Sequence, residues 1–234
     1  MATKSAQPRA APTSRPDTAS AREERRVVAP YITAWSAEQD LPFTLVERPD
    51  CGISYVDELP TDRDSHGVLW RRAAVRHQIG RPEFGKVHPL RQRRAMRRLL
   101  CQVCAEPAGR SDDGVLWLLR DYRHDWPGWP EGMASVEPPI CVPCVAVSLR
   151  LCPALRHGAV AVRAREHPIA GVRGALYRKG VLAPVAVEAA NLPYDAPGIH
   201  RMVASALIRE LRGCSLVSTG ELVEEHEATG GDGI

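Results

Sequence analysis

Two pairs of cysteines constrain this chain more than any other feature of its sequence. Cys101 and Cys104 form the first pair, Cys141 and Cys144 form the second, and 36 residues lie between the pairs. Two residues between paired cysteines let a tight turn direct both sulfurs at one ion, and structural Zn²⁺ takes four such ligands at tetrahedral angles. The spacing therefore predicts one closed zinc site with these four cysteines as ligands.

Other interpretations of the thiols stay open. A thioredoxin-type redox pair needs a strand-to-helix setting, which Cys141 and Cys144 provide only in part, and buried thiols can also lack a function. Disulfides do not fit a chain whose start has no apolar stretch typical of a secretory signal. Cys152 is a possible substitute ligand, whereas nothing marks Cys51 or Cys214 as reactive.

The segments around the pairs predict a particular order of elements. An apolar strand is expected at 115–119, and the second pair opens an apolar helix, expected to be buried, that runs to about residue 151. A knuckle, a β-containing insert and a second pair that opens a helix resemble the treble-clef class of zinc fingers over residues 100–155. The resemblance implies Cys101 and Cys104 on the knuckle and Cys141 and Cys144 at the first turn of the helix. Treble clefs occur in nucleases, ribosomal proteins, ubiquitin ligases and transcription factors, so the resemblance hardly restricts the function of this chain.

The wider chain is also similar to hypothetical proteins of high-GC Gram-positive bacteria. The stretches that carry this likeness are RQRRAMRRLLCQVC and LWLL, followed by DWPGWPEG and CVPC. The likeness implies a bacterial source and no particular activity.

The remaining patterns predict an α+β fold in five parts. We expect a disordered tail at 1–26, which has no Val, Ile, Leu or aromatic residue, then a mixed N-terminal region, the basic helix with the zinc module, a C-terminal antiparallel meander with an amphipathic helix, and an acidic tail that frays. The last four parts span 27–87, 88–156, 157–220 and 221–234. Strands are expected at 43–47, 53–58, 68–70, 159–165, 172–177 and 185–188. The amphipathic helix is expected at about 198–212, with Gly213 after its end.

A strongly basic helix is predicted to open at His88 and Pro89. Residues 71–98 hold ten basic residues and one acidic residue, and helical spacing places five arginines opposite the apolar residues of this helix: Arg91, Arg93, Arg94, Arg97 and Arg98. Guanidinium groups match phosphate oxygens in charge and geometry, which predicts contact with nucleic acid. The alternative is that this basic block, residues 71–98, pairs with the acidic segment 27–70. Arginine-rich codon usage can also raise the number of arginines on such a face without any function.

These features favour a zinc-binding, nucleic-acid-associated regulatory or accessory protein in the cytoplasm. A zinc-stabilised protein-interaction adaptor that docks an acidic partner is one alternative, and an HNH-like metal-dependent nuclease using His124 is another. No catalytic residue is assigned, because the common catalytic motifs are absent from the sequence. No apolar stretch is long enough to span a membrane. Trp126 and Trp129 are expected to pack in the core beside the zinc site rather than to stack on bases.

Overall fold

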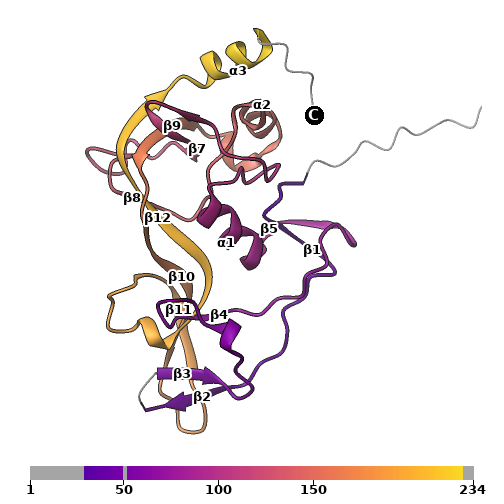
Figure 1. Ribbon diagram of the computed structural model, residues 1–234, viewed down its shortest axis with the longest axis vertical. Helices are drawn as coiled ribbons and strands as arrows, with labels where there is room; N and C mark the ends of the chain where they lie inside the picture. The colour runs from indigo at the N-terminus through magenta and orange to yellow at the C-terminus, as the bar shows by residue number, and fades with distance from the viewer. Residues whose placement is uncertain (1–28, 50–51, 229–234) are drawn as a thin grey trace, which may run out of the picture.

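One long strand, β12 (Met202–Val217), organises the fold (Figure 1). The computed structural model describes residues 29–49 and 52–228. β12 belongs to an eight-stranded sheet with the order β11-β10-β12-β9-β7-β6, in which its first half pairs antiparallel with β10 and its second half with β9. Two short strands, β4 and β8, also pair with it. The other strands of this sheet are β4 (Leu69–Trp70), β6 (Arg110–Ser111), β7 (Gly114–Arg120), β8 (Met133–Ser135), β9 (Ala159–Glu166), β10 (Ile169–Arg178) and β11 (Val185–Pro193).

The prediction of an amphipathic helix at 198–212 is wrong. A short 3₁₀ helix, η3 (Ile199–Arg201), is followed directly by β12. Met202, Val203 and Ala204 are consecutive and all buried, because this strand lies inside the sheet and packs on both faces. A strand buried on both faces has a nearly continuous apolar pattern, and that pattern also satisfies helical spacing.

Two apolar layers cover the half of the sheet that contains β7 and β9, near the top of Figure 1. On one face, Leu116 and Leu118 of β7 pack with Val145 of α2 (Val142–Leu151) and Leu222 of α3 (Thr219–Ala228). On the other face, Trp117 and Leu119 of β7 pack with residues that include Trp129 from the loop before β8. Because successive strand residues point to opposite faces, one strand serves both layers.

Two helices differ from their predictions. The acidic tail was expected to fray from residue 221, but α3 is helical to Ala228, and Leu222 is only 2% exposed. Burial of that side chain against α2 stabilises the helix. α2 itself is less buried than predicted, because Cys144 and Val145 are its buried residues and Leu151 at its end is exposed.

The N-terminal region contains two small antiparallel ribbons. β1 (Thr33–Trp35) pairs with β5 (Pro82–Val87), and β2 (Leu45–Arg48) pairs with β3 (Gly52–Tyr55). β2, β3 and β4 correspond to the expected strands, with shorter or slightly shifted bounds, whereas β1 and β5 were not predicted. A 3₁₀ turn, η1 (Pro60–Asp62), follows β3. The tail predicted as disordered at 1–26 lies outside the described residues, and the division of the chain into five parts stays a prediction.

α1 (Pro89–Arg98) lies at the centre of the molecule and packs on β12. Gln92 anchors it, because its side-chain amide bonds to both the N–H and the C=O of Leu207 at 2.9 Å and to the Val136 carbonyl at 2.8 Å. At its other end the buried Arg209 donates to the Met96 carbonyl at 2.7 Å. These bonds fix which side of α1 faces solvent. Among the described residues, no helix has the length and apolar character to cross a lipid bilayer.

Candidate metal centre

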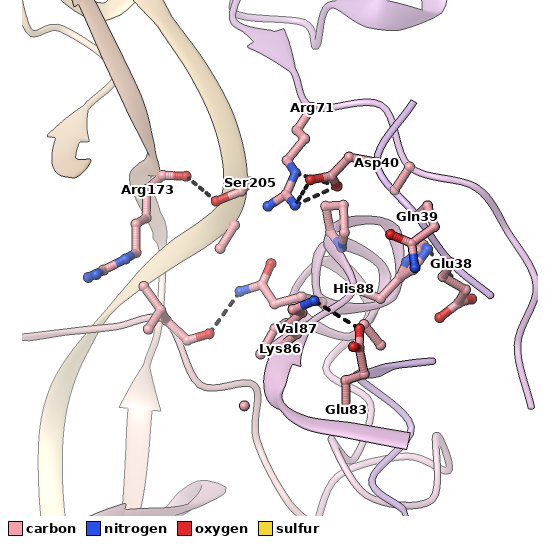
Figure 2. A pocket seen from close by; sticks show the side chains of 17 residues that line it. Glu38, Gln39, Asp40, Arg71, Glu83, Lys86, Val87, His88, Arg173 and Ser205 are labelled. Atoms are coloured by element: carbon pink, nitrogen blue, oxygen red, sulfur yellow. Dashed lines mark hydrogen bonds and ion pairs between the residues drawn. The ribbon is translucent and has the colours of Figure 1, made fainter. Parts of the chain in front are cut away.

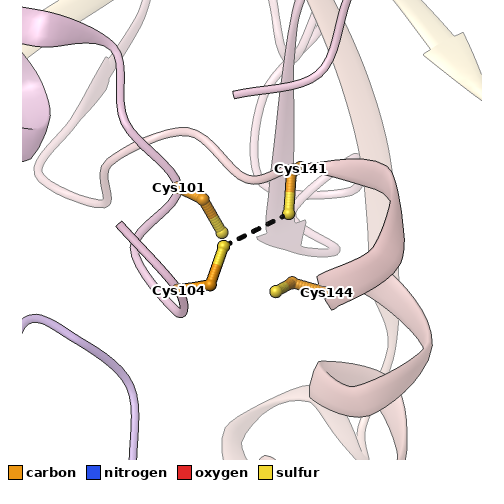
Figure 3. A group of neighbouring side chains, drawn as sticks. All are labelled: Cys101, Cys104, Cys141 and Cys144. Carbon is orange, nitrogen blue, oxygen red and sulfur yellow. Dashed lines mark hydrogen bonds between the residues drawn. The ribbon is translucent and has the colours of Figure 1, made fainter. Parts of the chain in front are cut away.

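The four predicted cysteine ligands converge on one point (Figure 3). The sulfurs of Cys101, Cys104, Cys141 and Cys144 all lie within 4.8 Å of one another. Cys101, Cys141 and Cys144 are buried, whereas Cys104 is partly exposed. The structure thus confirms that these side chains are positioned to bind a metal ion, and it brings together segments 36 residues apart in the sequence.

Local backbone geometry directs the first pair. α1 ends at Leu99, which adopts the left-handed conformation with φ 52°, and the chain then turns into Cys101. The Cys101 carbonyl accepts a bond from the Ala105 amide at 3.0 Å, and the Cys101 sulfur accepts one from the Val103 amide at 3.4 Å. A tight turn closed in this way directs both sulfurs to the same side.

The second pair sits at the beginning of α2. Cys141 is the N-cap residue, and the Cys144 amide donates to the Cys141 carbonyl at 3.1 Å. The first turn of a helix presents free amides and a positive partial charge, which favour thiolate over thiol. The helix therefore supplies geometry and electrostatics to the same pair.

The crowded thiols influence one another's protonation. Hydrogen bonds from Cys141 and Cys144 to the Cys101 sulfur lower the pKa of Cys101. The same bonds, with burial and the Cys101 charge, raise the pKa of Cys141 and Cys144. The Cys104 and Cys141 sulfurs are only 3.6 Å apart. Four thiolates at this spacing therefore need a cation among them, and metal binding would release protons.

Backbone bonds hold the two halves of the centre together. The Gln102 amide donates to the Pro139 carbonyl and the Gly109 amide to the Ile140 carbonyl, both at 2.9 Å. The N-terminal segment joins them, because the amides of Tyr31 and Ile32 donate to the carbonyls of Val103 and Gln102 at 2.9 and 3.2 Å. Three distant segments therefore meet at the knuckle. Among the described residues, these four cysteines form the group of His, Cys, Asp or Glu side chains that lie close enough together to bind one metal ion. Cys51 is not among the described residues.

The five arginines of the basic helix have different environments. Arg94, Arg97 and Arg98 are exposed. Arg93 is partly buried, and its guanidinium carbon lies 4.3 Å from the centre of the Trp70 ring. Arg91 is only 6% exposed. The predicted exposure is therefore confirmed for Arg94, Arg97 and Arg98, holds in part for Arg93 and is wrong for Arg91, while contact with nucleic acid stays a prediction.

Arg91 forms a buried ion pair instead. Its two terminal nitrogens lie 2.6 Å from the two carboxylate oxygens of Glu38, which also accept the amides of Trp35 and Arg76. Burial raises the pKa of the Glu38 carboxyl, but the bonds from Arg91 and Trp35, with His88 nearby, outweigh it and lower that pKa to about 2. The sequence alternative, in which the basic block pairs with the acidic segment, is correct at this position.

A polar cavity of about 400 Å³ lies beside this ion pair (Figure 2). Its charged side chains are largely paired with one another: Arg71 with Asp40, and Lys86 with Glu83 at 3.1 Å. Arg72, outside the cavity, binds Asp62 and Asp57 in the same manner. Carboxylates between residues 29 and 70 thus pair with Arg71, Arg72 and Arg91, and in the part of the chain that the structure describes no ion pair is found for the exposed arginines of α1.

Three further residues named in the sequence analysis lie in the loop between β7 and β8. Trp129 is 7% exposed and packs in the core, as expected, although on the face of β7 opposite to the cysteines. Trp126 is 40% exposed, and His124 is exposed as well. Among the described residues, His124 is not part of any group of His, Cys, Asp or Glu side chains that could hold a metal ion.

Sequence reasoning missed Glu38 and Gln92, whose partners are 53 and 115 residues away in the chain. No local pattern marks such side chains. Comparisons with known protein families, with curated proteins and with solved structures find no match to this chain. Its fold and site therefore describe an α+β protein with a four-cysteine cluster positioned to bind a metal ion.

Proposed function

We propose that Cys101, Cys104, Cys141 and Cys144 hold one Zn²⁺ as a structural ion, in a treble-clef-like module. A Zn–S distance of about 2.3 Å and tetrahedral angles place neighbouring sulfurs about 3.8 Å apart, which agrees with a cluster inside 4.8 Å. Four cysteines fill the coordination sphere and leave no position for substrate. The ion would stabilise the fold rather than perform chemistry.

We propose further that the protein associates with nucleic acid through α1, as a regulatory or accessory factor. The observation that carries this proposal is the exposed set Arg94, Arg97 and Arg98, for which no ion pair is found among the described residues. Arg94 donates one hydrogen bond, to the Tyr31 hydroxyl at 3.2 Å. Guanidinium groups without acidic partners are available to phosphate oxygens. Gln92 and the turn into Cys101 hold the helix in place, so the bound ion would orient this face.

The test is a fluorescence titration of the full chain with labelled nucleic acid at several salt concentrations. The variant Arg97→Ala/Arg98→Ala should weaken binding, and the slope of log affinity against log salt should fall by about 1.4 to 1.8 for two lost phosphate contacts. The matched control is Arg150→Ala/Arg178→Ala, which removes two exposed arginines from α2 and β10. Equal losses from both variants would contradict a specific role for α1.

A second candidate is the protein-interaction adaptor, and one observation favours it. An apolar groove of about 570 Å³ lies between β5 and α2 beside the knuckle, lined by residues that include Phe84, Val103, Val147 and Leu151. Phe84 and Leu151 are 63% and 51% exposed. The adaptor predicts that Leu151→Asp abolishes partner binding without changing nucleic-acid affinity. The nuclease alternative with His124 stays a prediction that no observed geometry supports.

A further inference from the structure

Two stacked pairs of side chains lie next to the exposed side of α1. The His66 and Tyr194 rings are nearly parallel, with centres 3.8 Å apart and an angle of 18° between their planes. Beside them the Arg93 guanidinium stacks on Trp70. We call His66, Tyr194, Trp70, Arg93 and Arg97 the stacking patch. The segment 63–70, which includes β4, the loop 194–198 and α1 contribute to it, so three parts of the chain converge on one surface.

One carboxylate holds both stacks in place. A single oxygen of Asp64 accepts bonds from the Trp70 indole N–H at 2.9 Å and from the Tyr194 hydroxyl at 3.2 Å. Its other oxygen accepts the amides of His66 and Val68 at 3.0 and 3.1 Å. The aromatic rings are therefore positioned before any ligand arrives, which reduces the entropy cost of binding. The four donors also occupy the carboxylate, which limits its repulsion of an anion.

Two arginines of the patch, Arg93 and Arg97, lie near a single carboxylate, that of Asp64. The Arg93 Nε–H is buried and finds no hydrogen-bond partner among the described residues. Burial and the neighbouring Arg97 lower the pKa of Arg93, and the nearby Asp64 carboxylate opposes this shift without reversing it. Arg97 is exposed and also acts on Tyr194. An anion bound between these groups would relieve the repulsion between them.

We propose that the stacking patch binds single-stranded nucleic acid, with an unpaired base stacked on the free face of His66 and the adjoining phosphate bound by Arg97. This inference rests on the proposed association with nucleic acid and specifies its substrate. His66 is exposed, and Tyr194 covers one face of its ring. A flat exposed ring accepts a base that has left its own stack, whereas the bases of a duplex already stack on one another. Arginines beside the ring supply the contact with the backbone.

The experiment compares a labelled 12-nucleotide single strand, as DNA and as RNA, with a 12-base-pair duplex, using fluorescence anisotropy with the full chain. His66→Ala should weaken single-strand binding about 5- to 140-fold, the range expected for one lost base stack, and leave duplex binding unchanged. His66→Phe keeps a flat ring and should retain the affinity of the unsubstituted chain. His157→Ala, which removes an exposed histidine elsewhere, is the control.

Three results would overturn the inference, and they separate it from the proposed function. If His66→Ala changes nothing while Arg97→Ala/Arg98→Ala weakens single strands and duplex alike, nucleic-acid association stands and the stacking inference fails. If the single strand binds no more tightly than the duplex, the inference that the stacking patch binds single-stranded nucleic acid is wrong. If no nucleic acid binds and poly-glutamate does, both proposals fail and an acidic protein partner replaces them.

Discussion

Loss of the Glu38 carboxylate should be among the most destabilising single changes in this protein. Its side chain is fully buried and receives two bonds from Arg91. The fall of its pKa from an ordinary 4.5 to about 2 corresponds to about 3 kcal/mol of stability at neutral pH. Glu38→Gln also leaves the Arg91 charge buried and unpaired, for which a cost of about 3–5 kcal/mol is typical.

The assay is urea unfolding at pH 7 with saturating zinc, and Asp40→Asn is the matched control. Asp40 pairs with Arg71, but both side chains are substantially exposed, so its loss should cost about 1 kcal/mol or less. Because the pKa of Glu38 is lowered in the folded state, its contribution is complete above about pH 4.5 and disappears as the pH falls towards 2. The difference between Glu38→Gln and the unsubstituted chain should therefore stay constant from pH 8 to pH 5.5. A cost no larger than that of Asp40→Asn would refute the reasoning.

Three further predictions concern other positions. Cys104→Ser should remove the bound zinc and lower Tm by about 10 °C or more, as measured by mass spectrometry and calorimetry, whereas Cys152→Ser should leave metal content unchanged. Gln92→Leu should cost about 3 kcal/mol in urea unfolding, because the buried N–H and C=O of Leu207 lose their partner; a cost below about 1 kcal/mol would show that another group replaces it. Gly114→Ala should cost about 2 kcal/mol or more in the same assay, since its φ is 114° and a β-carbon would lie 2.1 Å from the Ala164 carbonyl oxygen; unchanged stability would contradict this geometry.

The parts of the fold predicted from sequence are those determined by local chemistry. Paired cysteines need only a short turn to direct two sulfurs, so Cys101 and Cys104 could be identified without knowing their surroundings. The beginning of α1 at Pro89 follows from the fixed φ of proline, which suits the first turn of a helix. Convergence of the two pairs required more, because it depends on backbone bonds between segments far apart in the chain.

The failures occurred where tertiary contacts decide the structure. The stretch from Met202 to Leu211 has helical spacing, yet it forms a strand because β10 covers one of its edges, β4 and β8 pair along the other, and apolar layers cover both faces. Helical spacing placed Arg91 on the exposed side, but Glu38 attracts it into the interior from 53 residues away. The helical spacing of residues within α1 carries no information about a partner so far away in the chain. Arg94, Arg97 and Arg98 lie on the exposed side, as helical spacing predicts, and no comparable carboxylate partner is found for them among the described residues.

The position of β12 in the chain affects how this protein is made. Its partners β4, β8, β9 and β10 all leave the ribosome before it does, and each of them pairs with β12 in the finished sheet. Until Met202 to Val217 emerges, those strands expose unpaired edges and the apolar layers beside them stay open. The growing chain therefore passes through a stage with unpaired strand edges, which are prone to aggregation.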